Sequence, residues 1–145
     1  MKILHIINSL ERGGAENLLT RMCLIDKKNI HEVIALKTSD YNGKLLEGNK
    51  TIVHSLKLTN NPLSLIKLIK IFKIIRNFSP DLVHTWLYHS DLIGGIISKI
   101  IGVKKIYWNV RHSDINSNKS KLLTRIIIKI LSLLSNTIPN KIIFC

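Results

Sequence analysis

The chain has 145 residues, close to the size of one ordinary domain and long enough to bury a single sizeable core. Hydrophobic residues make up 46% of it, which excludes intrinsic disorder, and 22 basic against 9 acidic residues give a net charge of +13. Its two cysteines, Cys23 and Cys145, cannot form a disulfide framework, so we expect a reducing compartment.

No segment has the pattern of an export signal or of a membrane-spanning helix. The N-terminal apolar run, from Ile3 to Ile7, is too short for the apolar core of a signal peptide. The most apolar later stretches, 63–78 and 122–134, are broken by basic residues and lack the roughly 18 consecutive apolar residues that a span needs. We therefore expect a cytoplasmic protein that at most lies on the inner face of the cytoplasmic membrane.

Strand and helix patterns alternate in the first half of the chain. The short apolar run 2–7 predicts a buried parallel strand, and 15–25 carries apolar residues at helical spacing. Further strands are expected at 31–36 and 51–55. The polar stretch between them, 38–50, contains Asn42-Gly43 and Gly48 and is predicted to be a loop.

The second half continues the alternation. A helix begins at Asn61-Pro62 and ends before Ser79-Pro80, because a residue that precedes proline avoids the helical region. The remaining elements are a strand at 82–85, a helix at 90–101 that stops at Gly102, a strand at 105–110, a helix at 117–135 and a strand at 141–144. Six strands and four helices in this order predict one doubly wound α/β domain with a parallel sheet, spanning 1–145.

Ligands of such sheets bind beyond the carboxyl ends of the strands, so the loops there hold the candidate functional residues. After the first strand, Gly13 and Gly14 precede a helix whose free N–H groups favour an anion. The spacing is not G-x-G-x-x-G, and no suitable acidic residue follows the second strand, so dinucleotide binding is only weakly indicated. A plain tight turn is the equal alternative.

A tryptophan, a tyrosine and two histidines follow the fourth strand, between His84 and Asp91. Aromatic faces stack on sugars or bases, while imidazoles and hydroxyls form hydrogen bonds with sugar hydroxyls. The cluster therefore indicates a ligand site. The alternative makes His84 and Trp86 packed core residues and leaves Ser90 or Asp91 as a helix cap.

After the fifth strand, Arg111 can clamp a phosphate or carboxylate. The imidazoles and carboxylates of these loops are His84, His89, Asp91, His112 and Asp114. They match neither H-E-x-x-H nor a cysteine-rich zinc signature, so no metal and no cofactor is predicted. No G-x-S-x-G elbow supports a Ser-His-Asp triad.

Two helices carry much of the basic charge. One half of the helix at 62–78 holds Lys67, Lys70, Lys73 and Arg76, opposite an apolar half. The later helix places a narrow stripe beside its apolar face: Lys121, Arg125 and Lys129. Both patterns fit solvated outer faces, and both fit docking to an anionic membrane surface. No exposed aromatics interleave with the basic residues, so nucleic acid is not an expected partner.

Three stretches together, 2–16, 80–91 and 108–113, resemble the N-terminal domain of a family 4 glycosyltransferase with GT-B architecture. The resemblance implies two Rossmann-like domains across a cleft, the N-terminal one binding the acceptor. It implies that Gly13 and Gly14 approach the diphosphate of a nucleotide-sugar donor. The resemblance also implies which residues line the sugar and acceptor side of the cleft: Glu16, His84, Trp86, His89, Asp91, Arg111 and His112.

The same resemblance implies retaining transfer of a hexose, commonly without a metal, to a lipid-linked or cell-envelope saccharide. The family's E-x7-E motif is missing here. The residues eight positions after each glutamate are Leu19, Leu24, Asp40 and Ser55. We therefore expect an acceptor-binding half that is inactive alone, with a separately encoded C-terminal domain as a candidate partner. The alternatives are a sugar- or nucleotide-binding module without catalysis and a basic peripheral membrane protein.

Overall fold

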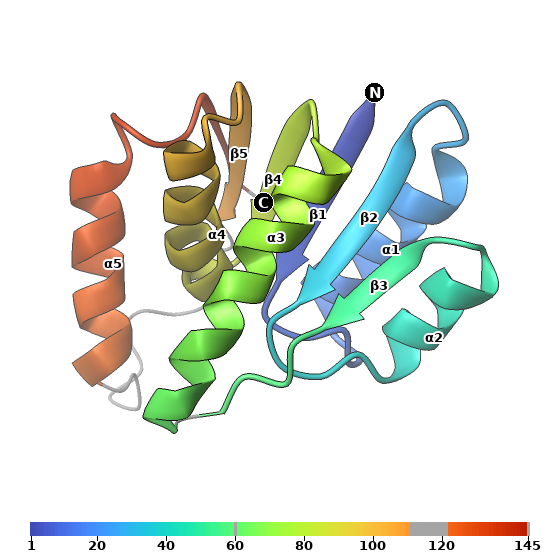
Figure 1. Cartoon of the computed structure of the whole chain (residues 1–145), viewed down its shortest axis with the longest axis horizontal. Helices are drawn as coiled ribbons and strands as arrows, with labels where there is room; N and C mark the ends of the chain where they lie inside the picture. The colour runs from blue at the N-terminus through green and yellow to red at the C-terminus, as the bar shows by residue number, and fades with distance from the viewer. Residues whose placement is uncertain (60, 111–121, 145) are drawn as a thin grey trace.

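A computed structural model of the chain describes residues 1–59, 61–110 and 122–144. Within them, six parallel strands form one sheet in the order β3-β2-β1-β4-β5-β6 (Figure 1). The strands are β1 (Lys2–Ile7), β2 (Ile30–Ala35), β3 (Ile52–Ser55), β4 (Leu82–Trp86), β5 (Lys105–Val110) and β6 (Lys141–Phe144). The predicted doubly wound α/β fold is confirmed.

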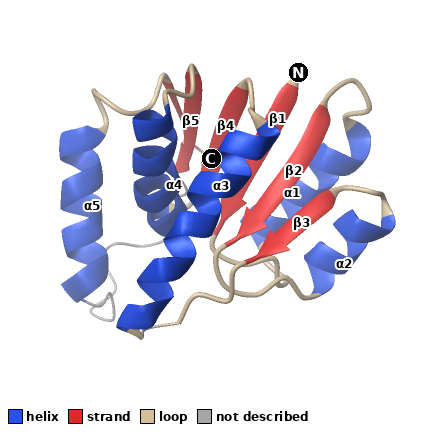
Figure 2. Ribbon diagram, in the orientation of Figure 1, coloured by secondary structure: helices blue, strands red, loops and turns tan. Residues whose placement is uncertain are grey.

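Helices cover both faces of the sheet (Figure 2). One face carries α1 (Gly14–Ile25) and α2 (Tyr41–Gly48), and the other carries α3 (Leu68–Phe78), α4 (Tyr88–Ile101) and α5 (Leu122–Leu134). A 3-10 turn (Pro62–Lys67) precedes α3. The strand side chains alternate between these two layers, so that Ile7 and Val33 pack beneath α1 while Leu4 and Ile6 pack beneath α3 and α4.

The two predicted helix stops are confirmed. α3 ends at Phe78, and Ser79 follows in the left-handed region with a φ of 49°. Gly102 ends α4 with a φ of 86°, a conformation that costs glycine little because it has no Cβ.

The prediction of a loop over 38–50 is wrong, because α2 occupies Tyr41–Gly48. Leu46 on this helix is fully buried and joins the core beneath α1. A Cβ on Gly43 would lie 2.9 Å from Cβ of Ser39, so glycine here permits the close packing of the helix start. The pair Asn42-Gly43, read as a turn signal, thus belongs to a short packed helix.

Several boundaries also differ from the prediction by one or two residues, and those near the site matter most. β4 continues through Trp86, one residue beyond the expected end, and α4 begins at Tyr88 rather than at Ser90. α5 is described from Leu122, and the first residues of the helix expected at 117–135 lie outside the described part of the chain. The extension of β4 places the candidate site residue Trp86 within the strand.

Candidate functional site

The carboxyl ends of the strands and the N-termini of α1 and α4 meet along one edge of the sheet, the lower edge in Figure 1. The loop after β1 is tied to the loop after β2: the backbone N–H of Leu10 donates to the carbonyl of Thr38 at 2.9 Å, and that of Lys37 donates to Asn8 at 2.8 Å. The Thr38 hydroxyl donates to Glu11 Oε1 at 2.6 Å. The loops after β1 and β2 are therefore held together by hydrogen bonds along this edge.

Asn42 at the start of α2 anchors the same loop. Its side chain is buried, and Nδ2 donates both to the carbonyl of Glu11 and to Asn17 Oδ1 on α1. The Arg12 guanidinium lies over the Tyr41 ring at 4.5 Å. The helix that sequence reasoning missed thus positions the glycine loop, and no motif in the sequence signalled its role.

The first turn of α1 presents backbone N–H groups beside the glycine pair. Gly13 is the N-cap in an extended conformation, and no side chain caps the helix. The Glu16 carboxylate folds back over Gly13, since a Cβ built there would lie 2.2 Å from Glu16 Oε2. A carboxylate is the charge that a helix N-terminus favours, so Glu16 occupies space that an incoming anion would have to share.

The junction between β4 and α4 has an unusual backbone. Leu87 adopts a φ of 69° and a ψ of 152°, a combination that non-glycine residues rarely occupy. His89 follows in the first turn of α4, half-buried, with its ring 5.0 Å from that of Tyr88. Burial, and next the positive charge of Lys37, lower the pKa of His89, so the imidazole is neutral at neutral pH and can both donate and accept hydrogen bonds.

Asp91 faces the inside of the domain. Its side chain has no exposed surface, and Oδ1 accepts a 2.5 Å hydrogen bond from the Thr85 hydroxyl. Burial raises the pKa of Asp91 to about 7. The residue does not cap α4, whose N-cap is Leu87, and it cannot touch a solute while the helix stays packed.

His84 and Trp86 lie within β4, on the face beneath α1, and both are buried. Their rings are 4.5 Å apart, and the Trp86 indole N–H donates to His5 Nδ1 at 3.3 Å. These contacts match the alternative of packed core residues, and no surface is left for sugar stacking. Arg111 and His112 lie outside the described residues.

Of the predicted site residues, the structure therefore places Gly13, Gly14, Glu16 and His89 along the open edge, while three others are packed inside. Sequence reasoning missed Lys37, which lies two residues beyond the end of β2 and whose charge helps to lower the pKa of His89. Its position after a predicted strand was the available signal. The edge can hold an anion near α1 and a hydroxylated ligand near His89.

A family model described as glycosyl transferase 4-like matches residues 23–143. The chain belongs to this family. The glycine loop lies just before the matched residues. No curated protein shows a significant match to the chain.

Solved structures share the fold. Anabaena Alr3699/HepE in complex with UDP matches with a TM-score of 0.73 and 21% identity, over 98% of this chain and 37% of its own. UDP-GlcNAc 2-epimerase from Methanocaldococcus jannaschii gives a TM-score of 0.61 at 14% identity, over 99% of this chain and 45% of its own. MurG from Acinetobacter baumannii gives a TM-score of 0.61 at 9% identity, over 99% of this chain and 41% of its own. This glycosyl transferase 4-like chain therefore spans less than half the length of these proteins, and its fold is one Rossmann-like half of a GT-B architecture.

Proposed function

We propose that the chain is the acceptor-binding half of a glycosyltransferase that moves a hexose from a nucleotide sugar to a lipid-linked or cell-envelope saccharide, with retention of configuration. The observation that carries the proposal is the open edge of a family 4-like domain. The first turn of α1, the neutral His89 in the first turn of α4 and the positively charged Lys37 after β2 lie along that edge. HepE, a structural neighbour, has been solved with UDP and with UDP and glucose.

The chain alone is proposed to be catalytically incomplete. Retaining transfer requires groups that stabilise both a leaving diphosphate and an oxocarbenium-like sugar, and the open edge offers one side of such a site. No E-x7-E spacing exists in the sequence. The donor-binding contacts would come from a second domain, separately encoded or joined to this chain.

The test joins this chain to the donor-binding domain of a family member and measures hexose transfer from nucleotide sugars to saccharide acceptors. His89→Ala is expected to lower kcat/KM at least tenfold, because the substrate hydroxyl loses a hydrogen-bond partner. His54→Ala is the matched control, since His54 pairs with Glu32 at 2.9 Å on β3 and lies within the sheet. Equal transfer by wild type and His89→Ala would contradict the site, and turnover by the unfused chain would contradict its incompleteness.

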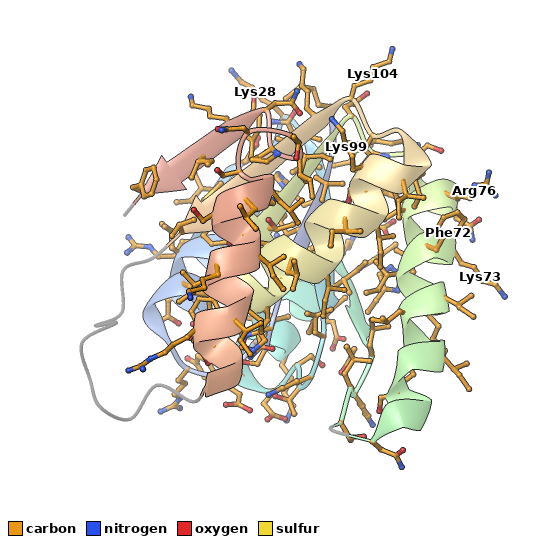
Figure 3. The ribbon with its side chains drawn as sticks, turned by 90° about the vertical axis from the view of Figure 1, so that its left-hand side faces the viewer. Lys28, Phe72, Lys73, Arg76, Lys99 and Lys104 are labelled. Atoms are coloured by element: carbon orange, nitrogen blue, oxygen red, sulfur yellow. The ribbon has the colours of Figure 1, made fainter. Side chains whose placement is uncertain are left out.

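A second function, docking to the anionic inner face of the cytoplasmic membrane, is favoured by the outer side of α3 and the turn before it. Ile66 and Ile69 are 63% and 57% exposed beside the exposed Lys70 and Lys73. Figure 3 shows Lys73 and Arg76 projecting from the outer side of α3, with the Arg76 guanidinium 5.1 Å from the Phe72 ring. Exposed apolar side chains among lysines suit an interface rich in anionic headgroups.

Lys67, by contrast, donates from Nζ to the carbonyl of Lys57 at 2.7 Å and ties the segment to the body of the domain. None of the helices in the described ranges is long and apolar enough to cross a bilayer. Any membrane contact of these helices is therefore proposed to be peripheral.

Co-sedimentation with phosphatidylglycerol vesicles tests the docking. Replacing both Lys70 and Lys73 with Glu is expected to weaken binding more than tenfold, because each lysine contributes about 1 kcal/mol near anionic headgroups. The matched control replaces both Lys28 and Lys44 with Glu. These lysines are exposed away from α3, and their replacement gives the same change in net charge. An equal loss in both variants would indicate net charge alone and contradict a docking face on α3.

A further inference from the structure

Three metal-ligating side chains meet beneath α1, away from the open edge. They are His5 on β1, Cys23 on α1 and His31 on β2, and we name them the inner cluster. Their donor atoms all lie within 4.8 Å of one another, and all three residues are buried. The members are far apart in the sequence, so no spacing motif could have revealed them.

The hydrogen bonds around the cluster fix the tautomers of both imidazoles. The Trp86 indole N–H donates to His5 Nδ1, so His5 carries its proton on Nε2. That Nε2–H donates to His31 Nδ1 at 3.0 Å, which leaves the His31 proton on Nε2. His31 Nδ1 therefore points a lone pair into the cluster.

A carboxylate stands behind His31, where metal-binding histidines commonly have one. Asp26 Oδ2 lies 3.3 Å from His31 Nε2, the nitrogen that carries the proton, although the two groups are not aligned for a hydrogen bond. Burial, and next the neighbouring imidazoles, hold the pKa of His5 well below its usual value, so its ring is neutral at neutral pH. Neutral imidazole is the form that binds a metal.

The cluster borders a cavity of about 450 Å³, whose polar lining residues are His5, Arg21, Asp26, His31 and His84, together with apolar side chains. His84 is buried, and its Nε2 has no hydrogen-bond partner among the described residues. Its ring lies 5.6 Å from that of His5. His84 thus adds a buried nitrogen without a protein partner to the lining of the cavity that the cluster borders.

We propose that the inner cluster binds a divalent cation of the zinc class through His5 Nε2, Cys23 Sγ and His31 Nδ1, with the fourth position toward His84 and the cavity. Zinc favours this mixture of imidazole and thiolate ligands and takes them at about 2.0–2.3 Å. Donor atoms spread over up to 4.8 Å must therefore draw together on binding, by shifts on the order of an ångström.

Binding requires two proton movements. The Cys23 thiol, whose pKa burial raises to about 12, loses its proton to solvent as the Sγ–metal bond forms. The His5 proton moves from Nε2 to Nδ1, which breaks the hydrogen bond from Trp86. Metal binding therefore releases one proton and changes the surroundings of the Trp86 indole. The ion would join β1, β2 and α1 as a structural crosslink.

Cobalt(II) titration of the chelator-treated full chain tests the proposal. One equivalent is expected to produce thiolate-to-cobalt charge-transfer absorption, to change tryptophan fluorescence and to be displaced by zinc. Cys23→Ser should abolish the charge-transfer absorption. Asp26→Asn should weaken cobalt binding at least tenfold, because the orienting carboxylate is lost.

Two controls match these variants: Cys145→Ser removes the other thiol, and His54→Ala removes a histidine that pairs with Glu32. Both should keep the absorption and the affinity. The proposal is overturned if the wild-type chain shows no charge-transfer absorption, or if the absorption survives Cys23→Ser. If circular dichroism shows that Cys23→Ser does not fold, Asp26→Asn decides. Unchanged cobalt affinity in Asp26→Asn would then overturn the proposal, and a tenfold loss would support it.

Discussion

The buried carboxyl group of Asp91 predicts a stability that depends on pH. Its pKa stands at about 7 in the folded domain against the usual 3.8, because burial disfavours the charged form. Between these values the folded state holds a proton that the unfolded chain has released, so stability falls as pH rises and the loss is complete above about pH 7. The gap corresponds to about 4 kcal/mol.

Asp91→Asn removes this titration while keeping an oxygen that can accept the hydrogen bond from Thr85. Urea unfolding of both proteins at about pH 4 and about pH 8 gives the difference in unfolding free energy. That difference is expected to shift by about 4 kcal/mol in favour of the variant between the two pH values. Glu47→Gln, which changes an exposed carboxyl, is the control for the loss of one negative charge.

Parallel curves for wild type and Asp91→Asn would refute the reasoning, because they would mean that the carboxyl ionises as freely in the folded domain as in the unfolded chain. Such a result would also mean that the Asp91 carboxyl is accessible to solvent and can take part in a site at the surface. A shift of the expected size would instead assign the residue to the packing between β4 and α4.

Three further changes test the packing and the supports of the site. Gly95→Ala places a Cβ 2.7 Å from Trp108 Nε1 and should lower the unfolding free energy by about 1–3 kcal/mol, whereas Gly48→Ala, with open space around it, should not destabilise the domain. Asn42→Ala leaves the Glu11 carbonyl without its side-chain donor, so a loss of about 1–3 kcal/mol and faster hydrogen exchange in the loop after β1 are expected. Burial lowers the pKa of His84 to about 4, so His84→Gln should remove a loss of stability of about 3 kcal/mol as pH falls from 6.5 toward 4, measured by urea unfolding.

The fold was predictable because its strands are apolar runs and its helix ends carry strong breakers. The apolar run 2–7 predicted both ends of β1 correctly, and Gly102 marked the end of α4. α2 was not predictable, since Asn42-Gly43 has the composition of a turn and only tertiary contacts hold it in a helix. Leu46, buried beneath α1, supplies part of that tertiary stabilisation.

The candidate site was predictable only in part, for a geometric reason. Residues beyond a strand face the ligand edge, while residues within it face the helices, so one residue of strand length decides the outcome. Because β4 extends through Trp86, that side chain points beneath α1, beside His84, instead of toward the edge. The sequence offers no turn residue between Thr85 and Tyr88 that would have marked the true end.

Buried groups on the two sides of β4 titrate in opposite senses. On the side of α1, His84 resists protonation, so the stability it supports is present above its usual value of 6.5 and is lost as pH falls toward about 4. On the side of α4, Asp91 resists ionisation over nearly the same interval, and its contribution is lost as pH rises. Each changes the unfolding free energy by about 1.4 kcal/mol per pH unit there, with opposite sign, so the two contributions largely cancel. Burial also lowers the pKa values of His5 and His89, which add to the slope from His84, so wild-type stability should still fall as pH drops below about 6.5. His84→Gln should make that fall shallower, and Asp91→Asn should make it steeper.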